Sequence, residues 1–248
     1  HAAIVAAAQT RKWLEGVPND PDSKKNLRDL LVQSEKLTAR LPNVRRELRR
    51  QARVVAVPAA QLAIKGFGHS AVEINGKELS LSDWQTQSVR DLFFFFLSQP
   101  RPLTKEQVAE QFWRELDEPA KVRLRFKNEM YRLRRAVGNE VICFESPVYF
   151  FNRNFNYEYD VEAFESHLAR AKSSETPAAK IDFYRKAVDL VNGPYLDDIY
   201  FDWVIIDRER LDQMVLAALL ALAELYQKQA QLDEALAMCQ RAVEYNPV

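Results

Sequence analysis

Apolar residues recur at intervals of three and four along residues 122–137, at positions Val122, Phe126, Met130, Leu133 and Val137. At about 100° per residue these positions fall on one side of a helix, so this side is expected to be buried. The surrounding segment, residues 121–135 (KVRLRFKNEMYRLRR), carries seven basic residues and one acid. The exposed side of the predicted helix is therefore cationic.

Two further helices are predicted ahead of this basic segment. The first begins at a capping box formed by Ser82 and Gln85 and ends before a proline pair. Its expected core side consists of Trp84, Val89, Leu92, Phe93, Phe96 and Leu97. Thr104 and Gln107 repeat the capping-box spacing for the second helix, whose inner side is Val108, Ala109, Phe112 and Trp113. Pro119 then suits the first turn of the basic helix.

Short strands are predicted before and after the three helices. Residues 62–68 are followed by two alternating segments joined by Asn75-Gly76, a dipeptide typical of a tight hairpin because both residues tolerate positive φ. Behind the basic helix, residues 141–145 and 148–152 indicate a second hairpin with its turn at Ser146-Pro147. The predicted order is strands, three helices and a hairpin.

This order is typical of a winged helix-turn-helix, in which the third helix enters the major groove and the hairpin lies near the adjacent DNA backbone. The segments LSDWQTQSVRDLFFFFLSQPRPLTKEQVAEQFW, RFKNEMYRLRRAVG and VICFESPVYFFN resemble the DNA-binding domain of SARP-type transcriptional regulators, which is of the OmpR type with an initial sheet. The resemblance covers roughly residues 60–156. It implies a winged-helix DNA-binding domain at residues 58–156.

The C-terminal part, residues 157–248, is predicted to be all helical. An earlier pair of helices is expected around residues 160–171 and 177–191, with Phe164, Leu168, Ile181, Tyr184 and Val188 inward. A later pair carries residue types at the spacing of a tetratricopeptide repeat, namely Leu222, Ala223, Tyr226, Ala235, Ala242 and Pro247. A plain helical hairpin is the alternative interpretation of that pair.

The join between these pairs, Gly193-Pro194-Tyr195-Leu196 followed by Trp203 and residues 208–211 (RERL), resembles the bacterial transcriptional activator domain of SARP-type proteins. The resemblance implies a partner-binding or regulatory module. The fold class predicted for the whole chain is mainly α with small β-sheets, a winged helix-turn-helix domain plus an all-α tetratricopeptide-like repeat domain. Residues 1–57 are interpreted as a helical segment and linker at the end of a truncated region.

Composition restricts where a nucleic acid could bind. The chain has 248 residues, with 35 Lys plus Arg against 35 Asp plus Glu, so a uniformly basic coat is excluded and a binding surface must be local. Residues 40–53 hold six arginines and one Glu, whereas residues 157–209 hold twelve acids and six bases. The acids at 197–209 are interpreted as a solvated face, with a basic partner or the chain's own basic helix as alternatives.

Enzymatic chemistry is not expected. Three isolated histidines, the absence of a zinc-binding or phosphate-binding motif, and two cysteines without paired spacing predict no catalytic residue, metal or cofactor. His69 and His167 are interpreted as surface residues. The longest apolar run, residues 92–97, is too short for a membrane helix, and a cytoplasmic protein without a membrane partner is expected.

The predicted function is sequence-specific recognition of double-stranded DNA by a transcriptional regulator, an activator, through helix 121–137. Base edges are assigned to Asn128, Tyr131, Arg132 and Arg135, and phosphates to Lys121, Arg125 and Lys127, while Arg123 and Arg134 complete the predicted DNA-binding set. RNA polymerase or another protein is a possible partner of the helical repeats, and a homodimer is expected on DNA. The alternative is a protein-interaction scaffold whose winged helix does not bind DNA.

Overall fold

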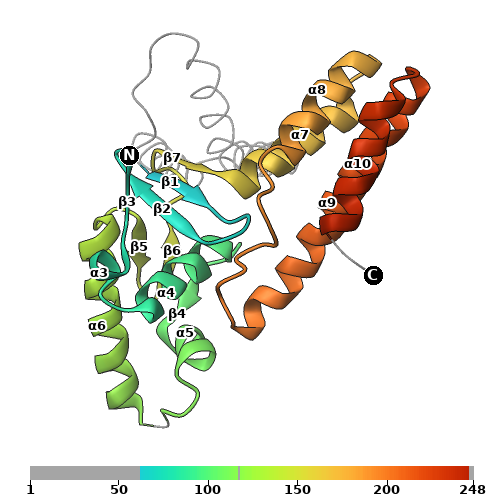
Figure 1. Ribbon diagram of the computed structural model, residues 1–248. Coiled ribbons are helices and arrows are strands. Elements are labelled where there is room, and N and C mark those ends of the chain that lie inside the picture. The colour runs from blue at the N-terminus through green and yellow to red at the C-terminus, as the bar shows by residue number, and fades with distance from the viewer. Residues whose placement is uncertain (1–61, 117, 246–248) are drawn as a thin grey trace, which may run out of the picture. The chain divides into compact units, whose positions relative to one another are not determined.

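The described part of the protein is mainly helical with two small sheets, as the sequence predicted. The computed structural model describes residues 62–116 and 118–245 (Figure 1). They belong to one compact unit, Pro58–Val248. The helices predicted for residues 1–57, and the arginines of residues 40–53, lie outside the described residues.

A four-stranded sheet opens this unit. β1 (Leu62–Lys65), β2 (Ala71–Ile74) and β3 (Lys77–Glu78) form an antiparallel meander. Asn75 and Gly76 join β2 to β3 with φ of 50° and 82°, which confirms the predicted hairpin. The fourth strand, β7 (Tyr157–Tyr159), pairs parallel with β1 at the edge of the sheet. This pairing was not predicted, because β7 is only three residues long.

The first predicted helix is two helices, and its predicted capping box is wrong. Ser80 caps the short α3 (Leu81–Trp84), and its partner in the box is Asp83. Gln85 then takes a φ of 65°, which interrupts the helix. Thr86 caps the longer α4 (Gln87–Ser98). Three capping side chains of similar type lie within seven residues, so spacing alone did not identify the pair that the fold uses.

α4 is buried on all its sides over residues 91–97, which include the run of four phenylalanines. Phe93 packs against Trp84 and Phe151, with ring centroids 5.5 Å and 6.0 Å away. Phe95 instead contacts Trp203, at 5.3 Å, which belongs to the C-terminal helices. A helix that is apolar all round needs neighbours on every side. The part of the fold around α4 and the C-terminal helices therefore share one core.

The next elements follow the predicted order. β4 (Leu103–Thr104) leads into α5 (Lys105–Phe112), where Thr104 and Gln107 form the predicted capping box. α6 (Pro119–Val137) begins with its proline in the first turn, as predicted. β5 (Ile142–Glu145) and β6 (Val148–Phe151) form the predicted hairpin, and β4 adds a third strand beside β6.

Four helices complete the described chain. α7 (Asp160–Ser173) packs on α8 (Pro177–Val188), and α9 (Asp202–Lys228) packs on both α8 and α10 (Leu232–Tyr245). The residues predicted to face inward are buried or partly buried, including Phe164, Leu168, Leu222, Ala223 and Tyr226. The assignment of α9 and α10 to a tetratricopeptide repeat stays a prediction. Within the described residues, no helix is long and apolar enough to cross a membrane.

Two glycine-containing motifs lie side by side. The segment 193–196, between α8 and α9, runs along residues 66–68 after β1. The Gly68 amide donates to the carbonyl of Pro194 at 2.9 Å, and the Leu196 amide donates to the carbonyl of Gly66 at 2.7 Å. Phe67 and Tyr195 form the β-bridge between them. The first sheet therefore extends toward the C-terminal helices.

A buried polar cluster lies beside this junction. Arg90 of α4 donates from Nη2 to Asp91 at 3.0 Å and pairs through Nη1 with Asp198 at 2.5 Å. Asp198 also accepts from the amide and hydroxyl of Ser70. The side chains of Arg90, Asp91 and Asp198 are 13%, 6% and 16% exposed. One guanidinium thus joins α4 to the segment before α9.

The stability contributed by Asp91 is expected to fall as pH rises. Burial raises the pKa of Asp91 to about 6, against an opposing effect of Arg90. The carboxyl of the unfolded chain has a pKa near 3.8, so between pH 3.8 and 6 the folded protein holds a proton that the unfolded chain has lost. The stability that this proton contributes is lost as pH rises through 6. Between pH 5 and 7.5 the free energy of unfolding of the wild type should fall by about 1 kcal/mol relative to Asp91→Asn. Denaturant unfolding of both proteins at the two pH values measures this; a constant difference would contradict it.

Candidate nucleic-acid interface

α6 buries the side that the apolar periodicity predicted. Phe126, Met130 and Leu133 are at most 3% exposed, Val137 is 6% exposed, and Val122 is partly buried. Phe126 lies between Trp113, which directly follows α5, and Tyr149 of β6, with ring centroids 6.4 Å and 4.8 Å away. The buried side of α6 therefore packs against the end of α5 and against the hairpin. Figure 1 shows α6 at the outer edge of this part of the fold.

The opposite side of α6 is exposed over its whole length. Leu124 and Tyr131 are 61% and 67% exposed, and Lys127, Asn128 and Arg135 are exposed with them. Counted at 100° per residue, these five side chains cover one face of the helix. The two charged members, Lys127 and Arg135, have no ion-pair partner among the described residues. This set, called here the open face, consists of Leu124, Lys127, Asn128, Tyr131 and Arg135.

Three of the predicted DNA-binding residues have partners on α6 or just before it. Lys121 pairs with Glu118 at 2.7 Å. Arg125 and Arg132 both pair with the same oxygen of Glu129, at 3.1 Å and 3.4 Å. Their side chains remain 50% and 36% exposed. These two arginines thus lie along one edge of the open face, attached to a common acid.

Arg134 is placed differently from the other predicted residues. Its Nη2 donates to the backbone carbonyl of Ile142 in β5 at 3.3 Å, and the side chain is half-buried. Its Nε is buried and has no hydrogen-bond partner within the described part of the chain. Arg134 therefore connects α6 to the hairpin, which leaves only part of its guanidinium available to a ligand.

Two residues of α6 that matter for this site were not among the predicted ones. Glu129, the single acid of residues 121–135, is 0% exposed, and Leu124 is an exposed apolar residue in the middle of the open face. The spacing could have identified Glu129, since it lies four residues after Arg125 and three before Arg132. The same count at 100° per residue places Leu124 opposite the buried stripe, so its exposure could have been predicted as well.

The hairpin after α6 carries no cation. Residues 139–152 include Glu140 and Glu145 and no Lys or Arg. Phe144 is 51% exposed and lies against Tyr149, with ring centroids 4.6 Å apart. Burial raises the pKa of the Cys143 thiol, with Glu145 adding to the effect, and both Cys143 and Cys239 are free thiols. The predicted approach of this hairpin to a DNA backbone thus has no support from charge.

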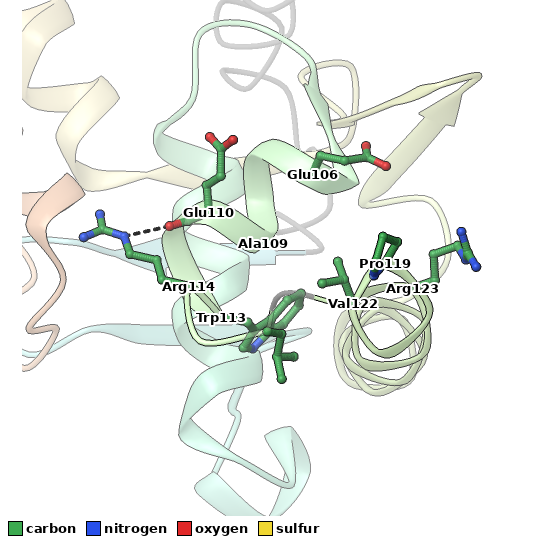
Figure 2. A pocket seen from close by; sticks show the side chains of 9 residues that line it. Glu106, Ala109, Glu110, Trp113, Arg114, Pro119, Val122 and Arg123 are labelled. Carbon is green, nitrogen blue, oxygen red and sulfur yellow. Dashed lines mark hydrogen bonds between the residues drawn. The ribbon is translucent and has the colours of Figure 1, made fainter.

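A groove lies between α5 and the start of α6. Figure 2 shows Glu106 and Glu110 of α5 on one side and Arg123 on the other. Trp113, Pro119 and Val122 contribute to its apolar part. Arg123 has no ion-pair partner within residues 62–116 and 118–245, so its guanidinium is available at the rim of this groove.

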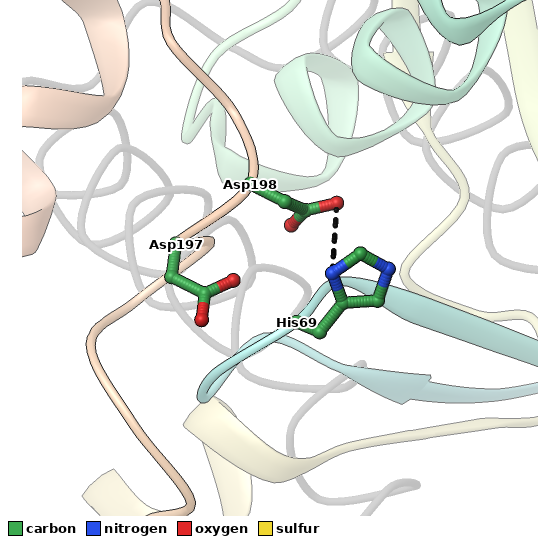
Figure 3. A group of neighbouring side chains, drawn as sticks. All are labelled: His69, Asp197 and Asp198. Carbon is green, nitrogen blue, oxygen red and sulfur yellow. Dashed lines mark ion pairs between the residues drawn. The ribbon is translucent and has the colours of Figure 1, made fainter.

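The acids before and at the start of α9 contact basic residues of the preceding part of the fold. Asp198 pairs with Arg90 of α4, and Asp202 pairs at 3.4 Å with Arg114, which follows α5. Figure 3 shows His69, Asp197 and Asp198 close together, and His69 Nδ1 lies 3.4 Å from Asp198. Because the Asp198 carboxylate already contacts Arg90 and Ser70, this group is an ion-pair junction. The exposed His69 fits the prediction of a surface residue, whereas His167 is half-buried and stacks on Phe183.

The comparisons with known proteins concern the C-terminal part and the fold. A family model described as the bacterial transcriptional activator domain matches residues 159–248. The solved structure of Mycobacterium tuberculosis EmbR in complex with a low affinity phosphopeptide is 18% identical, with a TM-score of 0.63 over 76% of this chain and 51% of that chain. The chain thus spans about half the length of EmbR. No curated protein matches the sequence. Residues 159–248 are therefore similar to a bacterial transcriptional activator domain, and the described chain shares the fold of part of EmbR.

Proposed function

We propose that this protein is a transcriptional regulator that binds double-stranded DNA in a sequence-specific manner by placing α6 in the major groove. The observation that carries the proposal is the open face, whose Lys127 and Arg135 have no ion-pair partner among the described residues and whose Asn128 is exposed, while the other side of α6 is buried. The helices α4, α5 and α6, followed by the hairpin of β5 and β6, suit a winged helix-turn-helix. The match of residues 159–248 to the bacterial transcriptional activator domain supports a role in transcription.

The open face has groups that suit base edges. Arg135 can donate two hydrogen bonds to guanine, and Asn128 can pair with adenine. Leu124 can contact a thymine methyl group, and the Tyr131 hydroxyl suits a base or a phosphate. Base reading is thus proposed for the middle of the helix, where an amide, a phenol and an apolar side chain lie next to each other.

Phosphate contacts are proposed for the cations around this face. Lys127 and Arg123 have no ion-pair partner in the part of the chain that the structure describes, whereas Lys121 would have to share its ammonium with Glu118. The hairpin, with two acids and no base, is expected to contribute little attraction to phosphates. DNA affinity should therefore depend on α6 more than on the hairpin, and log affinity should fall with log salt by about 0.9 per phosphate contacted.

Replacing Arg135 by Ala should reduce affinity for the preferred duplex by about 1–3 kcal/mol and relax the preference at one base pair. The physical reason is the loss of paired hydrogen bonds to a base edge. The measurement is selection from a random-sequence duplex library by the full chain, followed by mobility-shift titration of wild type and Arg135→Ala on the selected duplex.

Arg185→Ala is the matched control, since Arg185 is an exposed arginine on α8. It should leave affinity and the selected sequence unchanged. A wild-type protein that retains no duplex from the library, or that binds with no dependence on salt, would contradict the proposed function.

A protein-interaction scaffold is the second candidate. The acidic, aromatic hairpin favours it, because Glu145 and the exposed Phe144 do not suit a DNA backbone. A scaffold predicts no mobility shift with any duplex, so the same library separates the two functions. Association with RNA polymerase through the C-terminal helices, and dimerisation on DNA, are further parts of the proposal; the spacing of half-sites in the selected sequences tests the dimer.

A further inference from the structure

A fully buried carboxylate lies under the cationic edge of α6. Glu129 is 0% exposed, and its Oε1 lies 3.1 Å from Arg125 Nε and 3.4 Å from Arg132 Nη1. Its Oε2 is buried and has no hydrogen-bond partner among the described residues. The neighbouring positions along the buried side of α6 hold Phe126, Met130 and Leu133. An acid in such a place is costly for a fold, because burial disfavours the charge and one oxygen is left unsatisfied.

We propose that Glu129 is a positioning residue that fixes Arg125 and Arg132 along one edge of the open face and thereby sets sequence preference in DNA binding. The inference rests on the proposed function and deepens it. Two long side chains that would otherwise sample many rotamers share one carboxylate oxygen as the partner of their guanidinium groups. Because this carboxylate is buried, solvent screens it less than a surface partner.

The geometry leaves the outer ends of both guanidinium groups available. Arg125 contacts the acid through Nε, so both of its Nη groups can serve a ligand. Arg132 uses Nη1 and keeps Nε and Nη2. Half of the Arg125 side chain and about a third of the Arg132 side chain are exposed. Each arginine can thus present donors to a base edge or to one defined phosphate. The ion pair with Glu129 keeps the arginine from reaching other phosphates.

A purely structural role for Glu129 makes a different prediction. If the acid only stabilised the helix, its loss would weaken binding to every duplex to the same extent. If it positions the arginines, its neutralisation frees two cations to find phosphates on any sequence. Binding to unrelated DNA should then become stronger and more dependent on salt, while preference for the selected sequence declines.

The test uses the full chain, the duplex selected from the random library by the wild type, and a scrambled duplex of the same composition. Glu129→Gln keeps the shape of the side chain and removes its charge. We expect the affinity ratio between the two duplexes to fall by on the order of tenfold. We expect the salt dependence on the scrambled duplex to steepen by about 0.9 for each arginine that gains a phosphate.

Two further variants keep the result interpretable. Glu129→Met replaces the buried charge by an apolar side chain of similar size. It provides a second test of the inference if Glu129→Gln does not fold. It should reproduce the change in ratio and in salt dependence. In the double variant Arg125→Ala/Arg132→Ala, the additional change Glu129→Gln should have no effect on either quantity, since the acid acts through those two residues.

The outcomes separate this inference from the proposed function. If the wild type selects no duplex, the proposed function is wrong and the inference fails with it. If the wild type selects a sequence but a folded Glu129→Gln protein shows the same affinity ratio and salt dependence, only the inference is overturned. A uniform loss of affinity for both duplexes overturns it as well. Thermal unfolding of each variant establishes that the protein is folded.

Discussion

Phe93→Ala is expected to lower the free energy of unfolding by about 3–5 kcal/mol. Phe93 is 0% exposed and contacts aromatic rings on three elements: Trp84 of α3, Phe94 of α4 and Phe151 of β6. Truncation removes buried apolar surface and leaves a cavity among large rings that can collapse only in part. Since a whole domain is stabilised by roughly 5–15 kcal/mol, one such change removes a large fraction of the total. Denaturant unfolding followed by circular dichroism measures the change.

The control is another phenylalanine in the same part of the fold. Phe144 of the hairpin is 51% exposed and contacts Tyr149. Phe144→Ala should cost less than about 1 kcal/mol, because most of its surface is already in water. Equal effects of the two substitutions would show that α4 does not hold the core as described. Since α4 packs against α6, Phe93→Ala should also weaken binding of every duplex without changing the selected sequence.

Arg208→Met is expected to lower the free energy of unfolding by about 2–4 kcal/mol. Arg208 of α9 donates from Nε to the carbonyl of Tyr195 at 2.7 Å, and from Nη2 to the carbonyls of Leu196 and Ile199. All three residues are buried, so carbonyls left without a donor would be costly. Leu196 also has a φ of 47°, a strained backbone conformation that needs its surroundings to hold it.

A neighbouring arginine provides the control for this prediction. Arg210 lies on the same helix, is 47% exposed, and pairs with Glu165 and Asp207. Arg210→Met should cost less than about 1 kcal/mol, as is usual for exposed ion pairs. Hydrogen exchange gives a second measurement: the Leu196 amide, which donates to Gly66, should exchange faster in Arg208→Met. Unchanged exchange there would contradict the role given to Arg208.

The sequence by itself determined the elements whose signals are local. The Asn75-Gly76 turn, the capping box of Thr104 and Gln107 and the proline at the start of α6 were each predicted correctly. Such features depend on residues within one turn of helix or one hairpin, so a short stretch of sequence contains all the partners. The apolar periodicity likewise determined which side of α6 is buried.

Tertiary structure alone decided the features whose partners are distant in the chain. β7 pairs with β1 across about ninety residues, and the buried acids Asp91 and Glu129 depend on what surrounds them. The sequence identified the phenylalanine run as core, but only the fold showed that α4 needs Trp203 of α9 to cover it. The fold also showed which cations of α6 have an ion-pair partner and which have none among the described residues. The physical reason is that burial and charge pairing depend on which residues become neighbours in space. The apolar periodicity of a segment gives no information on its distant neighbours.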